Sequence, residues 1–298
     1  MASEKAIVLI TGANQGIGYE TAKALVLTKS PAGKPYHVLI GSRTLANGEQ
    51  AASELNALLE RQGSAAALQI DVTDETSVAA AAAQVEKEYG RLDAVVNNAG
   101  VMPHPPVHGG VLAALRFGLD VNVIGPVMVT EAFLPLLLKD EVDDPRLVFV
   151  GTSMASLIGA SDPENRYYKT VLGGSPSEYR ASKAAVNMLM IEYHKRYGTR
   201  DTADSSTPGA GKRVRVWTAD PGATATNFMG PQVKAMAIAN GLQGPEMGCK
   251  VLVSCIVGER DGQEAIISPK SNTCFTAIMS NGVTVALVGT PPAASGLS

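Results

Sequence analysis

Residues 6–18 read A-I-V-L-I-T-G-A-N-Q-G-I-G. The first five form a short, continuously apolar run, which is typical of a strand buried on both faces of a parallel sheet. A glycine-rich turn follows at once, and a helical pattern continues to about residue 28. Glycines allow a tight turn and a close approach of the backbone, and the start of a helix offers free N–H groups to a phosphate. This order of strand, turn and helix predicts an α/β fold with an anion-binding site at the turn.

The rest of the chain repeats this alternation of apolar runs and helical patterns. It predicts a doubly wound parallel sheet flanked by helices, in a single domain over residues 1–289. We expect a surface insertion at 157–177, a cover over the site at 223–262 and a flexible tail at 290–298. The predicted strands are 6–10, 36–40, 66–70, 94–96, 146–150, 214–219 and 283–288, and the main later helices are 48–61, 73–89, 112–138, 177–197 and 245–257.

The composition favours a soluble globular protein. The 298 residues are 45% hydrophobic and 18% charged, which is enough for a sizeable core. The net charge of −3 and the pI of about 5.9 favour neither nucleic acid nor an anionic membrane surface. The apolar runs are far shorter than the roughly 20 residues of a membrane span, and the first residues lack a signal-peptide pattern. We therefore expect a cytoplasmic protein with no nucleic-acid and no membrane partner.

Cysteines and histidines form no metal or disulfide pattern. Cys249, Cys255 and Cys274 are odd in number and lack metal spacing, so we interpret them as buried or inert thiols in a reducing compartment. His104 and His108 are four positions apart in a loop rich in Pro and Gly, but no third ligand follows. We expect no metal site.

The residues after the second strand, Ser42 and Arg43, indicate which dinucleotide would bind. A carboxylate at this place accepts a hydrogen bond from the ribose 2′-hydroxyl, whereas an arginine accommodates a 2′-phosphate. Because no carboxylate is present, Arg43 favours NADP(H), unless it is an ordinary exposed arginine. Asp71, just past the third strand, could bond the adenine amino group or cap the next turn.

Tyr179 and Lys183 are the principal candidates for chemistry. Four positions apart, they share one face of a predicted helix. A free phenol has a pKa near 10, and an ammonium roughly 4–6 Å away would lower that pKa by about two. The phenol could then exchange a proton near neutral pH. An isolated pair of this kind is more often solvated surface.

Three further groups depend on their surroundings. Asn122 lies mid-helix, where asparagine is disfavoured, so it marks a helix bend, an interior amide bonded to backbone, or a functional residue. Ser153 follows the fifth strand, with Thr152 and Ser156 as rivals. The small residues of 97–100, N-N-A-G, would let a cofactor lie against the backbone.

Taken together and in order, these residues resemble the classical short-chain dehydrogenase/reductase family. The resemblance covers roughly residues 5–226 and implies a Rossmann fold whose ligands bind beyond the carboxyl ends of the strands. The matching pieces are T-G-x-x-x-G-I-G at 11–18, Asp71, N-N-A-G at 97–100, Asn122, Ser153, Tyr179-x-x-x-Lys183 and Pro221-Gly222.

The resemblance also implies roles. Tyr179 would protonate a carbonyl oxygen, and Lys183 would lower the pKa of Tyr179 and bond the nicotinamide ribose. Ser153 would hold the substrate oxygen, and Asn122 would hold a water that links Lys183 to solvent. The residues expected to bind NADP(H) are Gly12, Asn14, Gln15, Gly16, Ile17, Gly18, Ser42, Arg43, Asp71, Val72, Asn98, Ala99, Gly100, Tyr179, Lys183, Pro221, Gly222, Thr224 and Thr226.

The long spacing between Ser153 and Tyr179, and the Ser42-Arg43 pair, resemble the NADPH-dependent carbonyl reductase branch. There an insertion before the tyrosine shields the helix used for dimerisation. We therefore expect reversible, NADPH-dependent reduction of a ketone or aldehyde, on an apolar small molecule, by a monomer or homodimer. The alternatives are an isomerase or epimerase, and a non-catalytic NADPH-binding protein, which would typically lack the tyrosine or the lysine.

Overall fold

The computed structural model describes residues 5–165, 168, 177–198, 212–229 and 231–263, and the strand residues 266–267, 278–279 and 283–284. Seven of its strands form one parallel sheet in the order β3-β2-β1-β4-β5-β6-β7. The predicted doubly wound parallel sheet is confirmed. The strands are β1 (Ala6–Thr11), β2 (Tyr36–Ser42), β3 (Ser64–Gln69), β4 (Ala94–Asn97), β5 (Arg146–Val150), β6 (Arg215–Ala219) and β7 (Ile266–Ile267).

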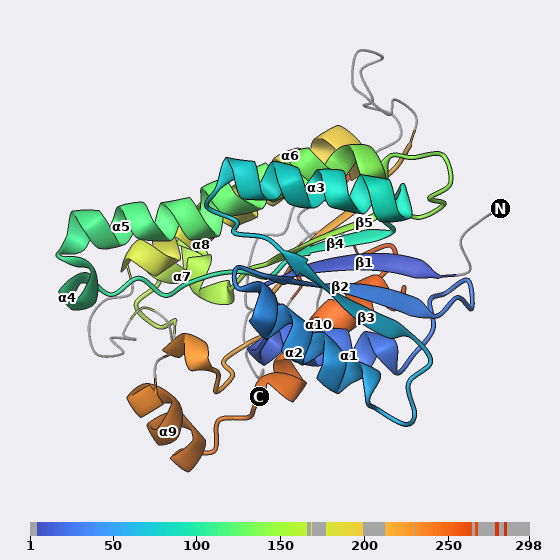
Figure 1. Cartoon of the computed structure of the whole chain (residues 1–298). Coiled ribbons are helices and arrows are strands. Elements are labelled where there is room, and N and C mark those ends of the chain that lie inside the picture. Colours follow the sequence, from blue (N-terminus) through green and yellow to red (C-terminus); the bar gives the residue numbers. More distant parts are fainter. Residues whose placement is uncertain are drawn as a thin grey trace, which may run out of the picture.

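Helices cover both faces of the sheet, as Figure 1 shows. One layer contains α1, α2 and α10, and the other contains α3, α6 and α8. The chain builds β1, β2 and β3 in one direction and then returns to place β4 on the other side of β1. In open α/β sheets, ligands bind beside such a reversal of strand order. The six helices are α1 (Gly16–Val26), α2 (Leu45–Asn56), α3 (Glu75–Tyr89), α6 (Gly125–Leu137), α8 (Ser177–Tyr193) and α10 (Pro245–Ile256).

Strand β1 shows why both faces need helices. Val8 and Ile10 belong to the hydrophobic core shared with α1 and α10, whereas Ile7 and Leu9 belong to the core shared with α3, α6 and α8. All four side chains are buried. A strand that is buried on both faces must be apolar at every position, so the run at 6–10 shows no alternation.

The long helix predicted at 112–138 is interrupted. Helix α5 (Val111–Leu119) runs into a π-helical turn at Asp120–Ile124, and α6 continues from there. The whole stretch Val111–Leu137 is long and apolar enough to cross a membrane, with a mean hydropathy of 1.5 over 18 residues. The sequence analysis considered only uninterrupted apolar runs and therefore did not identify this stretch as long enough. The second half of the stretch packs inside the protein, because Phe133 and Leu137 are fully buried in the core beside α3. Length and hydropathy alone are weak support for a membrane segment.

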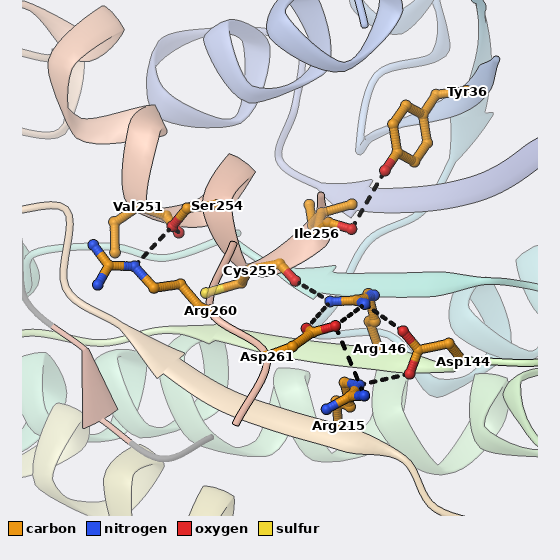
Figure 2. A network of polar contacts seen from close by, with 10 residues as sticks. All are labelled: Tyr36, Asp144, Arg146, Arg215, Val251, Ser254, Cys255, Ile256, Arg260 and Asp261. Atoms are coloured by element: carbon orange, nitrogen blue, oxygen red, sulfur yellow. Dashed lines mark hydrogen bonds and ion pairs between the residues drawn. The ribbon is translucent and has the colours of Figure 1, made fainter. Parts of the chain in front are cut away.

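A charged network lies at the amino-terminal ends of β5 and β6 (Figure 2). We call Asp144, Arg146, Arg215 and Asp261 the amino-end network. Arg146 is buried and donates to Asp261 Oδ1 at 2.7 Å, and it also pairs with Asp144. Its guanidinium lies 5.6 Å from the centre of the Trp217 ring. Through Asp261, this network attaches the segment after α10 to the sheet.

Several sequence predictions concern the last strands, the cysteines and the C-terminal residues. Strand β7 was not predicted, because a pair of residues gives no periodic pattern. Val283–Thr284 is a strand, β9, but it pairs with β8 (Ile278–Met279) outside the main sheet. Cys249 and Cys255 are buried free thiols, and burial raises the pKa of both. Cys274, residues 285–288 and the predicted tail at 290–298 lie outside the described residues, as does most of the predicted insertion after α7 (Leu157–Ser161).

Candidate active site

A cavity of about 630 Å³ opens at the carboxyl ends of the strands. It lies where the strand order reverses, which is the place expected for a ligand. Nearly all predicted cofactor residues line it, and Gly18 is the exception. The predicted residues that line it are Gly12, Asn14, Gln15, Gly16, Ile17, Ser42, Arg43, Asp71, Val72, Asn98, Ala99, Gly100, Tyr179, Lys183, Pro221, Gly222, Thr224 and Thr226.

The glycine-rich turn has the backbone shape that its sequence predicts. Gly12 and Gly16 have φ angles of 63° and 62°, which residues with a Cβ atom rarely adopt. A Cβ on Gly12 would also lie 3.1 Å from the Cα of Ala99. Gly18 serves packing, because a Cβ there would lie 2.5 Å from Asn98 Nδ2. The turn therefore fits a bound pyrophosphate at its first two glycines.

Thr11, the first residue of the T-G-x-x-x-G-I-G motif, joins this turn to the end of β4, a role that the sequence analysis did not assign to it. Its Oγ1 accepts hydrogen bonds from the backbone N–H groups of Asn98 and Ala99, both at 3.0 Å. In return, Asn98 Nδ2 donates to the carbonyl oxygens of Thr11 at 2.8 Å and Gly12 at 3.2 Å. These bonds fix the two strand ends against which a dinucleotide would lie.

One extremity of the cavity, which we call the Arg43 end, consists of Ser42, Arg43, Thr44 and Asn47. Ser42 Oγ donates to the carbonyl oxygen of Thr44 at 2.9 Å, which shapes this turn. None of these four residues is a carboxylate. Ser42 and Arg43, which were predicted to contact the ribose, both line the cavity. The arrangement is open to a phosphate on the ribose.

Asp71 lies on the same side of the cavity. Its Oδ1 accepts from Thr73 N at 2.9 Å and from Thr73 Oγ1 at 2.7 Å. Burial works in the opposite direction, but these bonds and the charge of Arg43 hold the pKa of Asp71 below its ordinary value. The turn-capping interpretation of Asp71 is thus confirmed, and within the described part of the chain its Oδ2 accepts no hydrogen bond.

Tyr179 and Lys183 lie on the first turns of α8 and line the cavity. They are 7% and 5% exposed, so the interpretation of this pair as solvated surface is wrong. Lys183 Nζ donates to the carbonyl oxygen of Val150, at the end of β5, at 2.9 Å. The ring of Phe228 packs edge-on against Tyr179, with 5.6 Å between ring centres.

Burial determines the proton affinity of both side chains. It lowers the pKa of Lys183 to about 8, because the ammonium loses its water. Burial first, and the negative charge of Asp220 second, raise the pKa of the Tyr179 phenol. The expected lowering of that pKa by Lys183 is therefore wrong in direction. The four-residue spacing predicts a nearby positive charge, but it does not report how much hydration a buried phenolate would lose.

Asn122 is fully buried in the π-helical turn and does not line the cavity. Its Oδ1 accepts from Val101 N at 2.8 Å, and its Nδ2 donates to Val101 O and to Ser182 Oγ, both at 2.9 Å. Ser182 Oγ in turn donates to the carbonyl oxygen of Tyr179 at 2.8 Å. The interpretation as an interior amide bonded to backbone is confirmed. Asn122 links the loop after β4 to the helix turn that holds Tyr179.

Ser153 lies beside the cavity and does not line it. Its backbone N–H donates to Asp220 Oδ2 at 2.8 Å, and Asp220 Oδ1 accepts from Gly222 N at 2.8 Å. Its rivals are engaged in capping: Thr152 Oγ1 accepts from Met154 N, and Ser156 Oγ accepts from Gly159 N. Asp220, which the sequence analysis overlooked, thus joins the loops that follow β5 and β6.

Residues after Thr226 close over the cavity, and the sequence analysis did not predict them as site residues. Asn227 and Phe228, in a 3₁₀ turn at Asn227–Met229, line it. Asn227 Nδ2 donates to Gln15 Oε1 at 2.9 Å, which connects this turn to the glycine-rich turn. The segment leads into α9 (Pro231–Ala239), within the region predicted to be a cover.

Comparison with known proteins agrees with this geometry. The model of the short chain dehydrogenase family matches residues 6–237. The chain belongs to this family. The short-chain dehydrogenase/reductase tropE of Talaromyces stipitatus is 33% identical over 267 residues, covering 87% of this chain and 93% of that protein. The short-chain dehydrogenase/reductase eupG of a Phoma species is 38% identical over 203 residues, covering 64% of this chain and 72% of that protein.

Solved structures show the same fold. A gluconate 5-dehydrogenase from Burkholderia cenocepacia, in complex with NADP and tartrate, has a TM-score of 0.64 and covers 88% of this chain and 92% of its own. At 19% identity, this likeness concerns the fold alone. Membership of the family makes this short-chain dehydrogenase an oxidoreductase of carbonyl/alcohol chemistry that uses NAD or NADP and acts on small molecules. The predicted family resemblance is confirmed.

Proposed function

We propose that this short-chain dehydrogenase uses NADPH to reduce a ketone or aldehyde to an alcohol. The observation that supports this most is that Arg43 and the buried Tyr179 and Lys183 line one cavity. A group that recognises a 2′-phosphate and a proton donor thus face the same space.

The preference for NADPH depends on the Arg43 end. A guanidinium forms charge-assisted, often bidentate hydrogen bonds with phosphate oxygens, and the cavity-lining residues that directly follow β2 include no carboxylate for a ribose 2′-hydroxyl. The glycine turn would hold the pyrophosphate with the N–H groups at the start of α1. When bound, the reduced nicotinamide supplies the hydride.

The protein then has to supply a proton and a fixed substrate oxygen. A phenol whose pKa is raised keeps its proton at neutral pH, and a developing alkoxide is a stronger base than a phenolate, so Tyr179 is suited to protonate it. We assign the donor that orients this oxygen to Ser153, which follows β5 beside the cavity at the position that the family resemblance implies. Lys183 would bond the nicotinamide ribose, and Asn122 would keep the turn below Tyr179 in place.

The region 223–262 would cover the substrate, in a protein with one domain over residues 1–289. Its segment with Asn227 and Phe228 already reaches across the cavity to Gln15 and Tyr179. Two apolar side chains of α9, Met236 and Ile238, are 58% and 54% exposed. Such side chains could pack on an apolar substrate or on a second copy of the chain.

The test is a panel of ketones and aldehydes with NADPH and NADH in parallel, followed by the loss of reduced nicotinamide absorbance. We expect turnover with NADPH, and we expect Arg43→Asp to raise the KM for NADPH by about 100-fold while changing that for NADH by less than about threefold. Cofactor binding without any turnover on the panel would contradict the proposal, and unchanged cofactor preference in Arg43→Asp would remove Arg43 from it. An isomerase would convert its substrate without net consumption of NADPH.

A further inference from the structure

One part of the cavity is lined by residues that are not among the predicted cofactor residues, which include Tyr179 and Lys183. We call its lining, Met102, His108, Phe117, Val121 and Phe228, the His108 end. These residues come from the loop after β4, from α4 (Pro105–His108), from α5, from the π-helical turn and from the 3₁₀ turn after Thr226. In Figure 1, α4 and α5 project beyond the sheet, away from α2, which follows Arg43. Apart from the imidazole of His108, the side chains of this end are apolar.

The wall of the His108 end is held in place by the protein. Asn122 makes two hydrogen bonds to the backbone of Val101, at the start of the loop. Pro103 is buried against α5, where a Cβ on Gly118 would lie only 2.5 Å from Pro103 Cγ. The rings of His108 and Phe117 stack, with 4.6 Å between their centres and 24° between their planes. The wall is therefore formed before a substrate arrives, which lowers the entropy lost on binding.

The hydrogen bonds of His108 determine what it can offer to a ligand. Its Nδ1 lies 3.1 Å from the backbone N of His104 and 2.9 Å from the carbonyl oxygen of His104. That oxygen already accepts the N–H groups of Val107 and His108, at 2.9 and 3.1 Å. If Nδ1 accepts the His104 N–H, the proton of the neutral ring is on Nε2. Among the described residues, Nε2 then has no partner and remains a donor for an oxygen in the cavity.

We propose that the His108 end binds an aromatic carbonyl compound that bears a second oxygen, remote from the reacting carbonyl, which accepts a hydrogen bond from His108 Nε2. Aromatic rings gain attraction beyond their buried area when they pack offset or edge-on against other rings, and Phe117 and Phe228 provide two such rings. A half-buried donor favours a substrate that pairs with it over one that leaves it unpaired. This inference rests on the proposed reductase function, because Phe228 of this end packs against Tyr179, the proposed proton donor.

The test compares acetophenone, its three ring-hydroxylated isomers and cyclohexyl methyl ketone, with NADPH saturating. We expect kcat/KM for acetophenone to exceed that for the saturated ketone by about 10-fold, and one hydroxylated isomer to exceed acetophenone by about 5-fold or more. His108→Ala should raise the KM for that isomer by about 5–10-fold and leave the KM for acetophenone within about twofold. Phe117→Leu should lower the preference for acetophenone over the saturated ketone by about 5-fold.

The matched control is His104→Ala, because the His104 side chain is exposed, makes no capping bond and does not line the cavity. It should leave all these ratios unchanged. Equal kcat/KM for acetophenone and cyclohexyl methyl ketone, or an equal effect of His108→Ala on all ring isomers, would overturn the inference and leave the reductase function standing. If no ketone is reduced, the proposed function fails, and the inference is decided by calorimetric binding of the hydroxyacetophenones to the NADP⁺-saturated protein. Binding that His108→Ala weakens for one isomer would support it, and equal or absent binding would overturn it.

Discussion

Arg146 and Lys183 are buried cations at opposite ends of strand β5. Arg146 begins the strand and is paired with Asp144 and Asp261. Lys183 donates to the carbonyl oxygen of Val150, the last residue of the strand, and has no ion-pair partner in the described part of the chain. The side-chain pKa values differ accordingly: although burial opposes it, the two carboxylates raise that of Arg146, whereas burial lowers that of Lys183 to about 8.

This difference separates a charge used for stability from one used for chemistry. A paired buried charge is held firmly in one protonation state, and removal of either partner is costly. A buried charge without a counter-charge strains the fold, and its pKa moves toward the working pH. Such perturbed groups gather at functional sites. The predictions below test whether the two ends of β5 differ in this way.

The largest change is expected for Lys183→Met. Turnover should fall by about 10³-fold, since the proposed proton donor loses its neighbour, whereas the protein should become more stable. The pKa of Lys183 is lower in the folded state, so the folded state penalises the charged form. This penalty is complete below about pH 8 and disappears as the pH rises through about 10.4, where the unfolded lysine loses its proton.

At pH 7 the gain in unfolding free energy for Lys183→Met should be about 2 kcal/mol, after allowing for the lost bond to Val150. It should shrink between about pH 8 and 10. Urea unfolding over this pH range measures it. The control Lys195→Met removes a 57% exposed lysine and should change stability by less than about 0.5 kcal/mol. A destabilised Lys183→Met protein at pH 7 would show that Lys183 is structural.

The opposite outcome is expected for Arg146→Ala at the amino-end network. Removal of the buried arginine leaves Asp144 and Asp261 with Arg215 alone as their shared cation, so unfolding free energy should fall by about 2–4 kcal/mol. Affinity for NADPH, measured below the lowered melting temperature, should not change. Arg215→Ala, which removes the more exposed arginine of the same network, should cost about 1 kcal/mol or less. Loss of NADPH binding in Arg146→Ala without loss of stability would break the comparison.

A smaller effect is expected for Asp220→Asn. The carboxylate of Asp220 raises the pKa of Tyr179, so an uncharged amide should lower it. Alcohol oxidation with NADP⁺ needs the phenolate, and its rate rises with pH through this pKa. At a fixed alkaline pH below this pKa, the rate of Asp220→Asn should therefore exceed that of the wild type by about 3–10-fold. Asp93→Asn is the matched control, because Asp93 also accepts a backbone N–H, from Ile7, but at the amino end of the sheet. An unchanged rate at that pH in Asp220→Asn would show that Asp220 only joins the loops.

The elements with strong local patterns could be predicted from the sequence. Strand β1 is apolar throughout because both its faces are covered, and the glycine turn after it adopts the positive φ angles that its glycines permit. The positions at the carboxyl ends of β2 and β4 face the cavity as expected, since parallel strands end at one edge.

The parts that depend on packing could not be predicted. The pKa of Tyr179 depends on how much water the phenol loses, and no spacing of residues reports that. Asp220 acts through backbone N–H groups of two separate loops, so nothing marks it in the sequence. The sequence analysis considered His108 only as a metal ligand, because its stacking on Phe117 depends on how α4 folds back on α5.

The central claim is that Tyr179 donates the proton in an NADPH-dependent reduction. The most direct measurement compares single-turnover NADPH oxidation in Tyr179→Phe and in Tyr193→Phe. Tyr193 lies on the same helix, and its hydroxyl donates a hydrogen bond to Glu131. We predict a loss of about 10³-fold for Tyr179→Phe with unchanged NADPH affinity, and near wild-type rates for Tyr193→Phe. A Tyr179→Phe enzyme that retains the wild-type rate would contradict the account.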